Sequence, residues 1–263
     1  MKFCLKAFCL FLLLYACKSS DNKKVYKPQS SGNINDLSVV IDNILWDSSV
    51  GETIRSTIGA PLYGLPQDEP QFSLRQIPSS VFSGFVKNTR LILKVVKGTA
   101  AATKFYKNPY ASPQRMVLVS GMTNQEISDQ SIQNQDKISK AFKTQELEEK
   151  QRRTKKSVFN TTSITKQFGI NIQFPSIYRI AKQVDDFLWI RRDIKTGTVN
   201  LMIYTLPYDD NITKEALAKR VIKVRDSIGK LYIPGPVEGT YMTTEAAYTP
   251  FYGNAKVGSL NSF

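Results

Sequence analysis

The stretch FLWIRRDIKTGTVNLMIYTL (Phe187–Leu206) is the clearest β-hairpin in the sequence, and it decides the fold class. Two runs rich in aromatic and β-branched residues, Phe187–Arg192 and Thr198–Leu206, flank the turn-forming residues Asp193–Gly197. Both faces of the segment LMIYTL (201–206) within the second run are apolar, which predicts a central strand that is covered on both sides. Because a hairpin joins antiparallel strands, we expect an antiparallel sheet.

Further strands are expected upstream of this hairpin. The alternating, β-branched pattern of Leu37–Asp42 predicts the first of them, and similar short runs follow at Phe72–Ile77, Thr89–Lys97, Ala102–Lys107 and Met116–Ser120. Strands outnumber helices, and the two do not alternate strictly. The sequence therefore predicts an α+β fold, a mainly antiparallel sheet with helices packed on one side.

Three segments have helical patterns. Ser49 to Glu52 has the S-x-x-E form of a capping box, and apolar residues recur at helical spacing up to Gly59. A long polar helix is expected over 124–156, whose few apolar residues allow only a thin buried stripe. A third helix is expected to begin at Asp210 or Asn211 and to end at Gly229. Its apolar face consists of Leu217, Val221, Val224 and Ile228.

Acidic and basic residues of the long helix are four positions apart at its C-terminal end. We expect the pairs Glu146–Lys150, Glu148–Arg152 and Glu149–Arg153 to lie on a solvated face. Each such pair stabilises a helix by only a few tenths of a kcal/mol.

All three cysteines of the chain lie near its start, at Cys4, Cys9 and Cys17. A positive beginning and an apolar run of about ten residues have the layout of a signal peptide, whereas a membrane span needs about 20. Leu14-Tyr15-Ala16-Cys17 resembles the lipobox of bacterial lipoproteins, in which the peptide is cut before the cysteine and the thiol receives a lipid. The resemblance implies cleavage after Ala16 and lipid attachment, with palmitate among the acyl groups, at Cys17.

An ordinary secretory signal is the alternative, with the cysteines acting as small apolar residues. A disulfide is excluded for the cleaved chain, because Cys17 then has no partner. Residues 1–16 are accordingly expected to be a signal peptide, and the polar residues 17–33 a flexible tether. Residues 34–263 are expected to form one α+β domain, with a division into two subdomains near residues 157–170 as the alternative.

The composition excludes several kinds of site. The chain has no histidine, which removes Ser-His-Asp and Cys-His nucleophilic sites and the usual zinc ligands. We expect no cofactor and no metal. The formal charge of +14 raises the question of nucleic acid, but an exported, lipid-anchored protein does not meet nucleic acid routinely, so we expect none as a partner.

Pairs of adjacent carboxylate residues remain as candidate catalytic groups. Asp68-Glu69, Asp185-Asp186 and Asp209-Asp210 lie in predicted turns, where acidic residues usually cap helices or face solvent. We therefore assign no catalytic residue, and we take Asp68 and Glu69 as candidate surface contacts. Tyr241 and Tyr248 are further candidates, whereas Trp46 and Trp189 are expected in the core.

Several short motifs occur together along most of the chain. They are Ser31-Gly32, Trp46 with Gly51, LPQDEP (65–70) with Phe72, Phe187-Leu188-Trp189, Tyr204 with Pro207-Tyr208, and Gly235-Pro236 with YMTTE (241–245). As a set with the lipobox they resemble an uncharacterised family of Bacteroidota lipoproteins, classed as a domain of unknown function. The family implies no activity. Its members continue with a Gly- and aromatic-rich segment, so the resemblance implies a truncated C-terminus here.

Two functions are consistent with the sequence. The first is a non-enzymatic lipoprotein of the outer membrane, facing the periplasm, that binds an envelope protein or glycan. Lys18 and a non-acidic tether favour this facing by family analogy, since surface export in this phylum follows acidic runs. The second is a hydrolase, or another envelope enzyme, that uses carboxylates.

Overall fold

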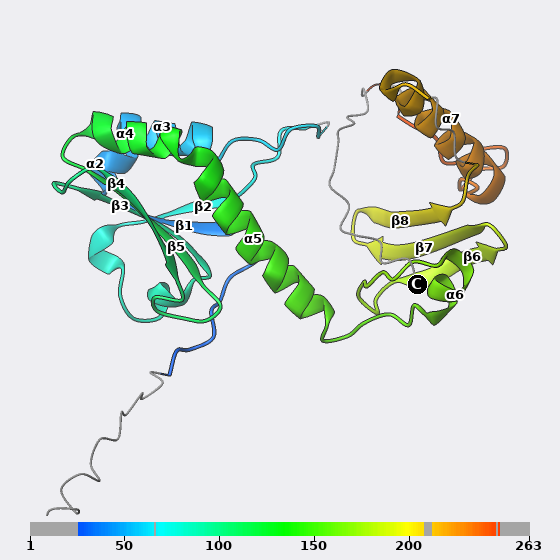
Figure 1. Ribbon diagram of the computed structural model, residues 1–263, viewed down its shortest axis with the longest axis horizontal. Helices are drawn as coiled ribbons and strands as arrows, with labels where there is room; N and C mark the ends of the chain where they lie inside the picture. Colours follow the sequence, from blue (N-terminus) through cyan, green and yellow to red (C-terminus); the bar gives the residue numbers. More distant parts are fainter. Residues whose placement is uncertain (1–25, 66, 208–211, 246, 248–263) are drawn as a thin grey trace, which may run out of the picture.

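The computed structural model describes residues 26–65, 67–207, 212–245 and 247, and it has the predicted α+β character. Its strands form two separate sheets, one of five strands and one of three (Figure 1). No helix of these described residues is long and apolar enough to cross a membrane.

The first sheet has the strand order β2-β1-β3-β5-β4. Its strands are β1 (Asp36–Val40), β2 (Ser73–Ile77), β3 (Leu91–Lys97), β4 (Ala102–Lys107) and β5 (Arg115–Gly121). The pairs β1–β2, β1–β3 and β3–β5 are parallel, and only β4 runs antiparallel to its neighbour β5. The predicted antiparallel character is therefore only partly confirmed. Helices that follow β1 carry the chain back before β2, which makes that pair parallel.

The helices of this region pack on one face of the first sheet, as predicted (Figure 1). They are α2 (Asn43–Trp46), α3 (Ser49–Thr57), α4 (Asn124–Gln133) and α5 (Gln135–Thr154). Val50, Ile54 and Ile58 are fully buried against the sheet. The cap of α3 lies one residue earlier than predicted, because the side chain of Ser48 accepts the hydrogen bond from the Val50 amide.

The opposite face of the first sheet carries a smaller core. Two short 3-10 helices, η2 (Ser79–Val81) and η3 (Gly84–Asn88), lie in the connection from β2 to β3. Between them Phe82 is buried against Val40 and Ile92. Both faces of the central strands β1 and β3 are therefore covered, which is the usual state of parallel strands.

The predicted long polar helix is present as α5, but its predicted extent over residues 124–156 is wrong, because residues 124–133 form the separate helix α4 with a break at Asn134. This residue leaves the helical region at φ −110° and ψ 6°. Its side-chain amide donates to the Gln130 carbonyl and to Thr103 on β4. These bonds compete with the helical backbone, which is how Asn commonly ends a helix.

The second sheet is antiparallel and has the order β6-β7-β8. Its strands are β6 (Arg179–Val184), β7 (Phe187–Ile194) and β8 (Gly197–Tyr204), so the hairpin predicted from the sequence is β7–β8. The sequence did not reveal β6. Because β6 pairs with β7, the central strand is β7, and the prediction of a central β8 is wrong.

A helix lies on each face of the second sheet. Ile164 of α6 (Thr162–Phe168) packs with Leu188 and Ile190 of β7. On the other face, Tyr232 of α7 (Lys214–Tyr232) stacks on Phe187 with the ring centroids 4.1 Å apart.

Helix α7 differs from its prediction at both ends. Asp210 and Asn211 lie outside the described residues, and Thr213 is the N-cap, its side chain accepting from the Ala216 amide. Gly229 lies inside the helix rather than at its end. A Cβ at this position would lie 2.1 Å from the Met242 carbonyl oxygen, so the glycine permits close approach of the following chain rather than helix termination.

Candidate functional site

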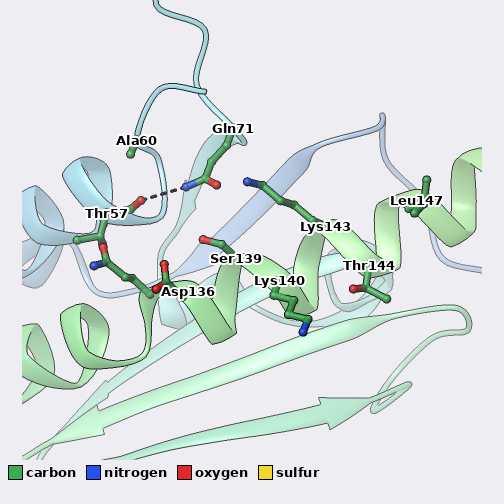
Figure 2. A pocket seen from close by; sticks show the side chains of 10 residues that line it. Thr57, Ala60, Gln71, Asp136, Ser139, Lys140, Lys143, Thr144 and Leu147 are labelled. Carbon is green, nitrogen blue, oxygen red and sulfur yellow. Dashed lines mark hydrogen bonds between the residues drawn. The ribbon is translucent and has the colours of Figure 1, made fainter. Parts of the chain in front are cut away.

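An open groove of about 550 Å³ runs between α5 and the segment that joins α3 to β2 (Figure 2). Eight of its ten lining residues have polar side chains. The lining residues are Thr57, Ala60, Gln71, Gln135, Asp136, Ser139, Lys140, Lys143, Thr144 and Leu147. The hydroxyl, amide and ammonium groups can donate several hydrogen bonds, as a polar ligand requires.

Two cations, Lys140 and Lys143, line this groove. Figure 2 shows the Lys143 side chain extending toward Gln71, whereas Lys140 points away from that side. The Gln71 amide is held in place, since its nitrogen donates to the Thr57 carbonyl at 3.1 Å. Asp136 is the one carboxylate in the lining. The groove therefore lacks the two facing carboxyl groups that acid/base hydrolysis of a glycosidic bond requires.

Residues 61–65 and 67–70 belong to an arm beside the groove. Pro61 and Pro70 form an isolated bridge at its base, and the Leu62 amide donates to the Glu69 carbonyl at 2.8 Å. Asp68 and Glu69, the predicted surface contacts, are exposed on this arm, and so is Tyr63, with 85% of its surface accessible. The arm thus exposes both acidic residues, and neither belongs to the lining of the groove.

A buried ionic cluster lies at the other end of α5, and the sequence did not reveal it. Arg90, which precedes β3, donates to Glu146 through Nε at 2.6 Å and through Nη2 at 3.1 Å. The same guanidinium donates to the carbonyl oxygens of Gly32 and Asn33, at 3.1 and 2.6 Å. Arg90, Glu146 and Glu149 are each at most 3% exposed. We call these three side chains and the two carbonyl groups the Arg90 clamp.

Glu149 completes the clamp from the next turn of α5. Its carboxylate accepts from Arg152 at 2.7 and 2.9 Å and from Arg153 at 2.7 Å. The hydrogen bonds from Arg152 and then from Arg153 outweigh burial and lower the pKa of Glu149 to about 2. The clamp is a structural site, because its charged groups are paired with one another and closed to solvent.

Of the three ion pairs expected on α5, only Glu149–Arg153 is among the salt bridges of the described residues. Glu146 pairs with Arg90 instead of Lys150, and Arg152 pairs with Glu149 instead of Glu148. The expectation of a solvated face therefore fails for Glu146 and Glu149. One signal could have identified them: they continue the spacing of the buried Ile138 and Phe142 along the helix.

A second, smaller cavity of about 330 Å³ lies between β8, α7 and residues 242–245. Asp226 and Glu245 both line it. The Asp226 carboxylate accepts from the amide and the hydroxyl of Thr244, at 2.8 and 2.6 Å. The Thr244 hydroxyl, its amide and nearby Arg225 lower the pKa of Asp226. The charged Asp226 carboxylate thus binds Thr244 and holds the segment after α7 against the helix.

The other predicted site residues are distributed over separate places. Tyr241 is 40% exposed, and the Lys230 ammonium lies 5.5 Å from its ring centroid. Cys17, Ala16 and Tyr248 lie outside the described residues, as do Asp209 and Asp210. Asp185 and Asp186 are exposed. The structure therefore does not bring the predicted surface contacts together into one site.

The two tryptophans expected in the core are both half-buried. Trp46 packs against the main core, with the Arg55 guanidinium 4.8 Å from its ring centroid. The indole nitrogen of Trp189 donates to Asn200 at 2.9 Å. Among the described residues, no group of three or more Asp, Glu, Cys or His residues is arranged to hold a metal ion.

Two family models match the chain, and the boundary between them lies between the first sheet and the second. Residues 30–155 match a family model described as a domain of unknown function (DUF8532), and residues 157–261 match a second (DUF4837). Two domains of unknown function are thus found in the sequence. The groove and the Arg90 clamp lie in DUF8532, and the cavity at Asp226 lies in DUF4837. Neither a curated protein nor a solved structure matches the chain.

Proposed function

We propose that this chain is a lipoprotein of the Bacteroidota type, held by a lipid on Cys17, that binds an envelope component without catalysing a reaction. Its body lies in the periplasm, at the outer membrane. The Ala16-Cys17 junction after a short apolar run supports the anchor. The polar composition of residues 17–33 supports a tether, whose last residues join the fold through the bridges of Gln29 and Ser31. The non-acidic tether supports the periplasmic facing.

The groove beside α5 is the observation that carries the binding role. It combines Lys143 with hydroxyl and amide groups, and it is open along its length. These donors suit a polar ligand with negative groups, such as an anionic glycan or an acidic protein segment. An ammonium at such a surface contributes chiefly to the rate and selectivity of binding.

A carboxylate-based hydrolase is the alternative, and the cavity with Asp226 and Glu245 is where it would act. The lowered pKa of Asp226 keeps this carboxyl group ionised at neutral pH, so it is not a proton donor there. Its hydrogen bonds to Thr244 already occupy one carboxylate oxygen. The cavity therefore supports a structural role better than an acid/base pair.

The anchor is tested by metabolic labelling of cells with an alkyne-bearing palmitate. The wild-type chain should take up the label, and Cys17→Ala should not. Continued labelling of Cys17→Ala would refute the lipid site. Protease treatment of intact cells tests the facing: the chain should survive, and its loss would place the protein on the cell surface.

The groove is tested by recovering the lipidated protein from its native envelope after mild crosslinking. Lys143→Gln should reduce the yield of the crosslinked partner several-fold, and Lys104→Gln on the exposed strand β4 should not. Equal yields from the wild type and Lys143→Gln would exclude the groove as the binding site. Identification of the crosslinked material then separates a glycan from a protein.

A further inference from the structure

A long part of the first domain carries basic residues and no acidic ones. Residues 70–125 contain no Asp or Glu, although the whole chain has 22 of them in 263 residues. The basic residues of this part are Arg75, Lys87, Arg90, Lys94, Lys97, Lys104, Lys107 and Arg115. Of the five strands of the first sheet, only β1 contributes a carboxylate, that of Asp36. The positive charge of the chain is therefore concentrated here, and a surface of one sign attracts a partner of the opposite sign.

Two of these lysines lie over the smaller core, on the face of the sheet opposite the helices. The Lys94 ammonium is 5.8 Å from the ring centroid of Phe82, and the Lys87 ammonium is 5.4 Å from that of Tyr110. The two rings pack edge to face with their centroids 5.7 Å apart. Among the described residues, neither lysine forms a salt bridge. We call Lys87, Tyr110, Phe82 and Lys94 the basic row, because no carboxylate of the described chain neutralises its two charges.

Apolar side chains are exposed on the segment that covers this face. Phe85 in η3 is 84% exposed and Val81 in η2 is 54% exposed, whereas Phe82 between them is buried. An exposed aromatic ring beside lysines suits the interface of a bilayer, where the ring enters the acyl boundary and the ammonium groups reach the head groups. An acidic polysaccharide would use the charges and leave Phe85 in water.

The tether joins the domain beside the basic row. The Ser31 amide donates to the Asn88 carbonyl at 2.9 Å, directly after Lys87 in the chain. The Lys27 ammonium donates to the Asn108 carbonyl, in the connection from β4 to β5 that also carries Tyr110. This end of the domain thus has a third lysine, and the chain toward the N-terminus departs from it.

We propose that this face binds the anionic lipid head groups of a membrane surface, with Lys87 and Lys94 at lipid phosphates and Phe85 inserted in the interface. The charge and the exposed ring carry the proposal, and only the orientation rests on the proposed lipid at Cys17. Nine residues separate Cys17 from Tyr26, and they span at most about 30 Å. An anchor within that distance would hold the basic row close to the bilayer.

The first test is sedimentation of the mature chain, residues 17–263 with Cys17→Ala, so that no lipid is attached. It should bind phosphatidylcholine vesicles that contain phosphatidylglycerol and should not bind pure phosphatidylcholine. Lys87→Gln with Lys94→Gln should weaken binding about tenfold or more, because each lysine near an anionic surface contributes about fivefold. Lys137→Gln with Lys150→Gln removes the same charge from exposed positions of α5 and should change binding less than about twofold.

The second test measures insertion of the exposed ring. In the Cys17→Ala chain, Phe85→Cys introduces a single thiol, because no cysteine follows residue 17. A nitrobenzoxadiazole label on this thiol should shift its emission to the blue when vesicles with phosphatidylglycerol are added. Ile44→Cys is the matched control, since Ile44 is 86% exposed on α2 in the helical layer of the other face. Its label should not respond.

Three results would overturn the proposal. One is that vesicles with phosphatidylglycerol are not bound, and another is that both double variants weaken binding equally. The third is binding without a blue shift at residue 85, because the face would then recognise charge alone, as an acidic polymer does. Circular dichroism of each variant verifies that the fold is intact. These outcomes are independent of palmitate labelling at Cys17, so failure of either proposal leaves the other standing.

Discussion

Arg90 fixes the beginning of the first domain through the buried groups around it. Its guanidinium is bonded to Glu146 and to two backbone carbonyl groups, at 2% exposure. Arg90→Met should lower the free energy of unfolding by about 3–5 kcal/mol, because Glu146 would keep a buried charge without its partner. Urea unfolding measures this loss. Arg75→Met at an exposed position of β2 is the control, and an equal loss there would contradict the assignment.

Glu149 makes the same cluster sensitive to acid. The pKa of Glu149 is about 2 in the folded protein, compared with its ordinary value of 4.5, so the folded state favours the charged carboxylate. This contribution is complete above pH 4.5 and is lost as the pH falls through 2, with a total of about 3 kcal/mol. Glu149→Gln should unfold more easily at pH 7 and should lose less stability between pH 5 and pH 2 than the wild type. Parallel pH curves for the two proteins would refute the assignment.

Some residue roles followed from the sequence and others did not. The burial of Val50, Ile54 and Ile58 followed from helical spacing alone. The burial of Glu146 and Glu149 did not, because a charged residue is rarely buried without a partner, and the partner Arg90 is 56 residues from Glu146 along the chain. The expected pairs within α5 seemed to explain these charges, but in the folded chain Glu146 pairs with Arg90 instead.

At the scale of elements, α2 and α3 are joined by a close backbone approach at Gly51. A Cβ at this position would lie 1.9 Å from the Trp46 carbonyl oxygen. Gly51→Ala should therefore destabilise the first domain by about 1–3 kcal/mol, since the two helices must move apart. Thermal unfolding measures the change. Glu52→Ala, the exposed next residue, is the matched control, and a comparable loss in it would contradict this explanation.

The strand segments other than β6 were predicted closely, but the parallel pairing in the first sheet was not. Residues 102–107 were predicted as a strand and form β4 with these bounds. The parallel direction of β1, β2 and β3 escaped prediction because alternation of side chains reveals a strand but not the direction of its neighbour. The β7–β8 hairpin was predictable because its short turn fixes both the register and the direction.

At the scale of the whole molecule, the two sheets have separate cores, and we expect two unfolding transitions. Phe142→Ala should lower the first domain's transition by roughly 10 °C or more through the cavity it leaves, and should not move the other. Ile190→Ala should lower only the transition of the second domain. Differential scanning calorimetry distinguishes the two. One transition that both variants shift equally would show that the domains unfold together.

The candidate sites differ in how far the sequence could reveal them. The groove combines residues of α3, of the α3–β2 segment and of α5, so only the folded chain assembles it. Cys17 needs no fold, because a short apolar run and a following cysteine are adjacent in the sequence. The apolar face of α7 could be predicted from the sequence, but the exposure of Leu217 and Val221 on it could not.

The Arg90 clamp has a mechanical consequence. It grips the backbone at Gly32 and Asn33, where the tether joins the fold, and isolated bridges pair Gln29 with Ser112 and Ser31 with Thr89 just before it. A lipid on Cys17, as proposed, would transmit any tension between membrane and ligand through this point. These bridges and the hydrogen bonds from Arg90 must break before strand β1 can separate from the sheet. The end of the domain that carries the anchor is therefore the end that these interactions stabilise.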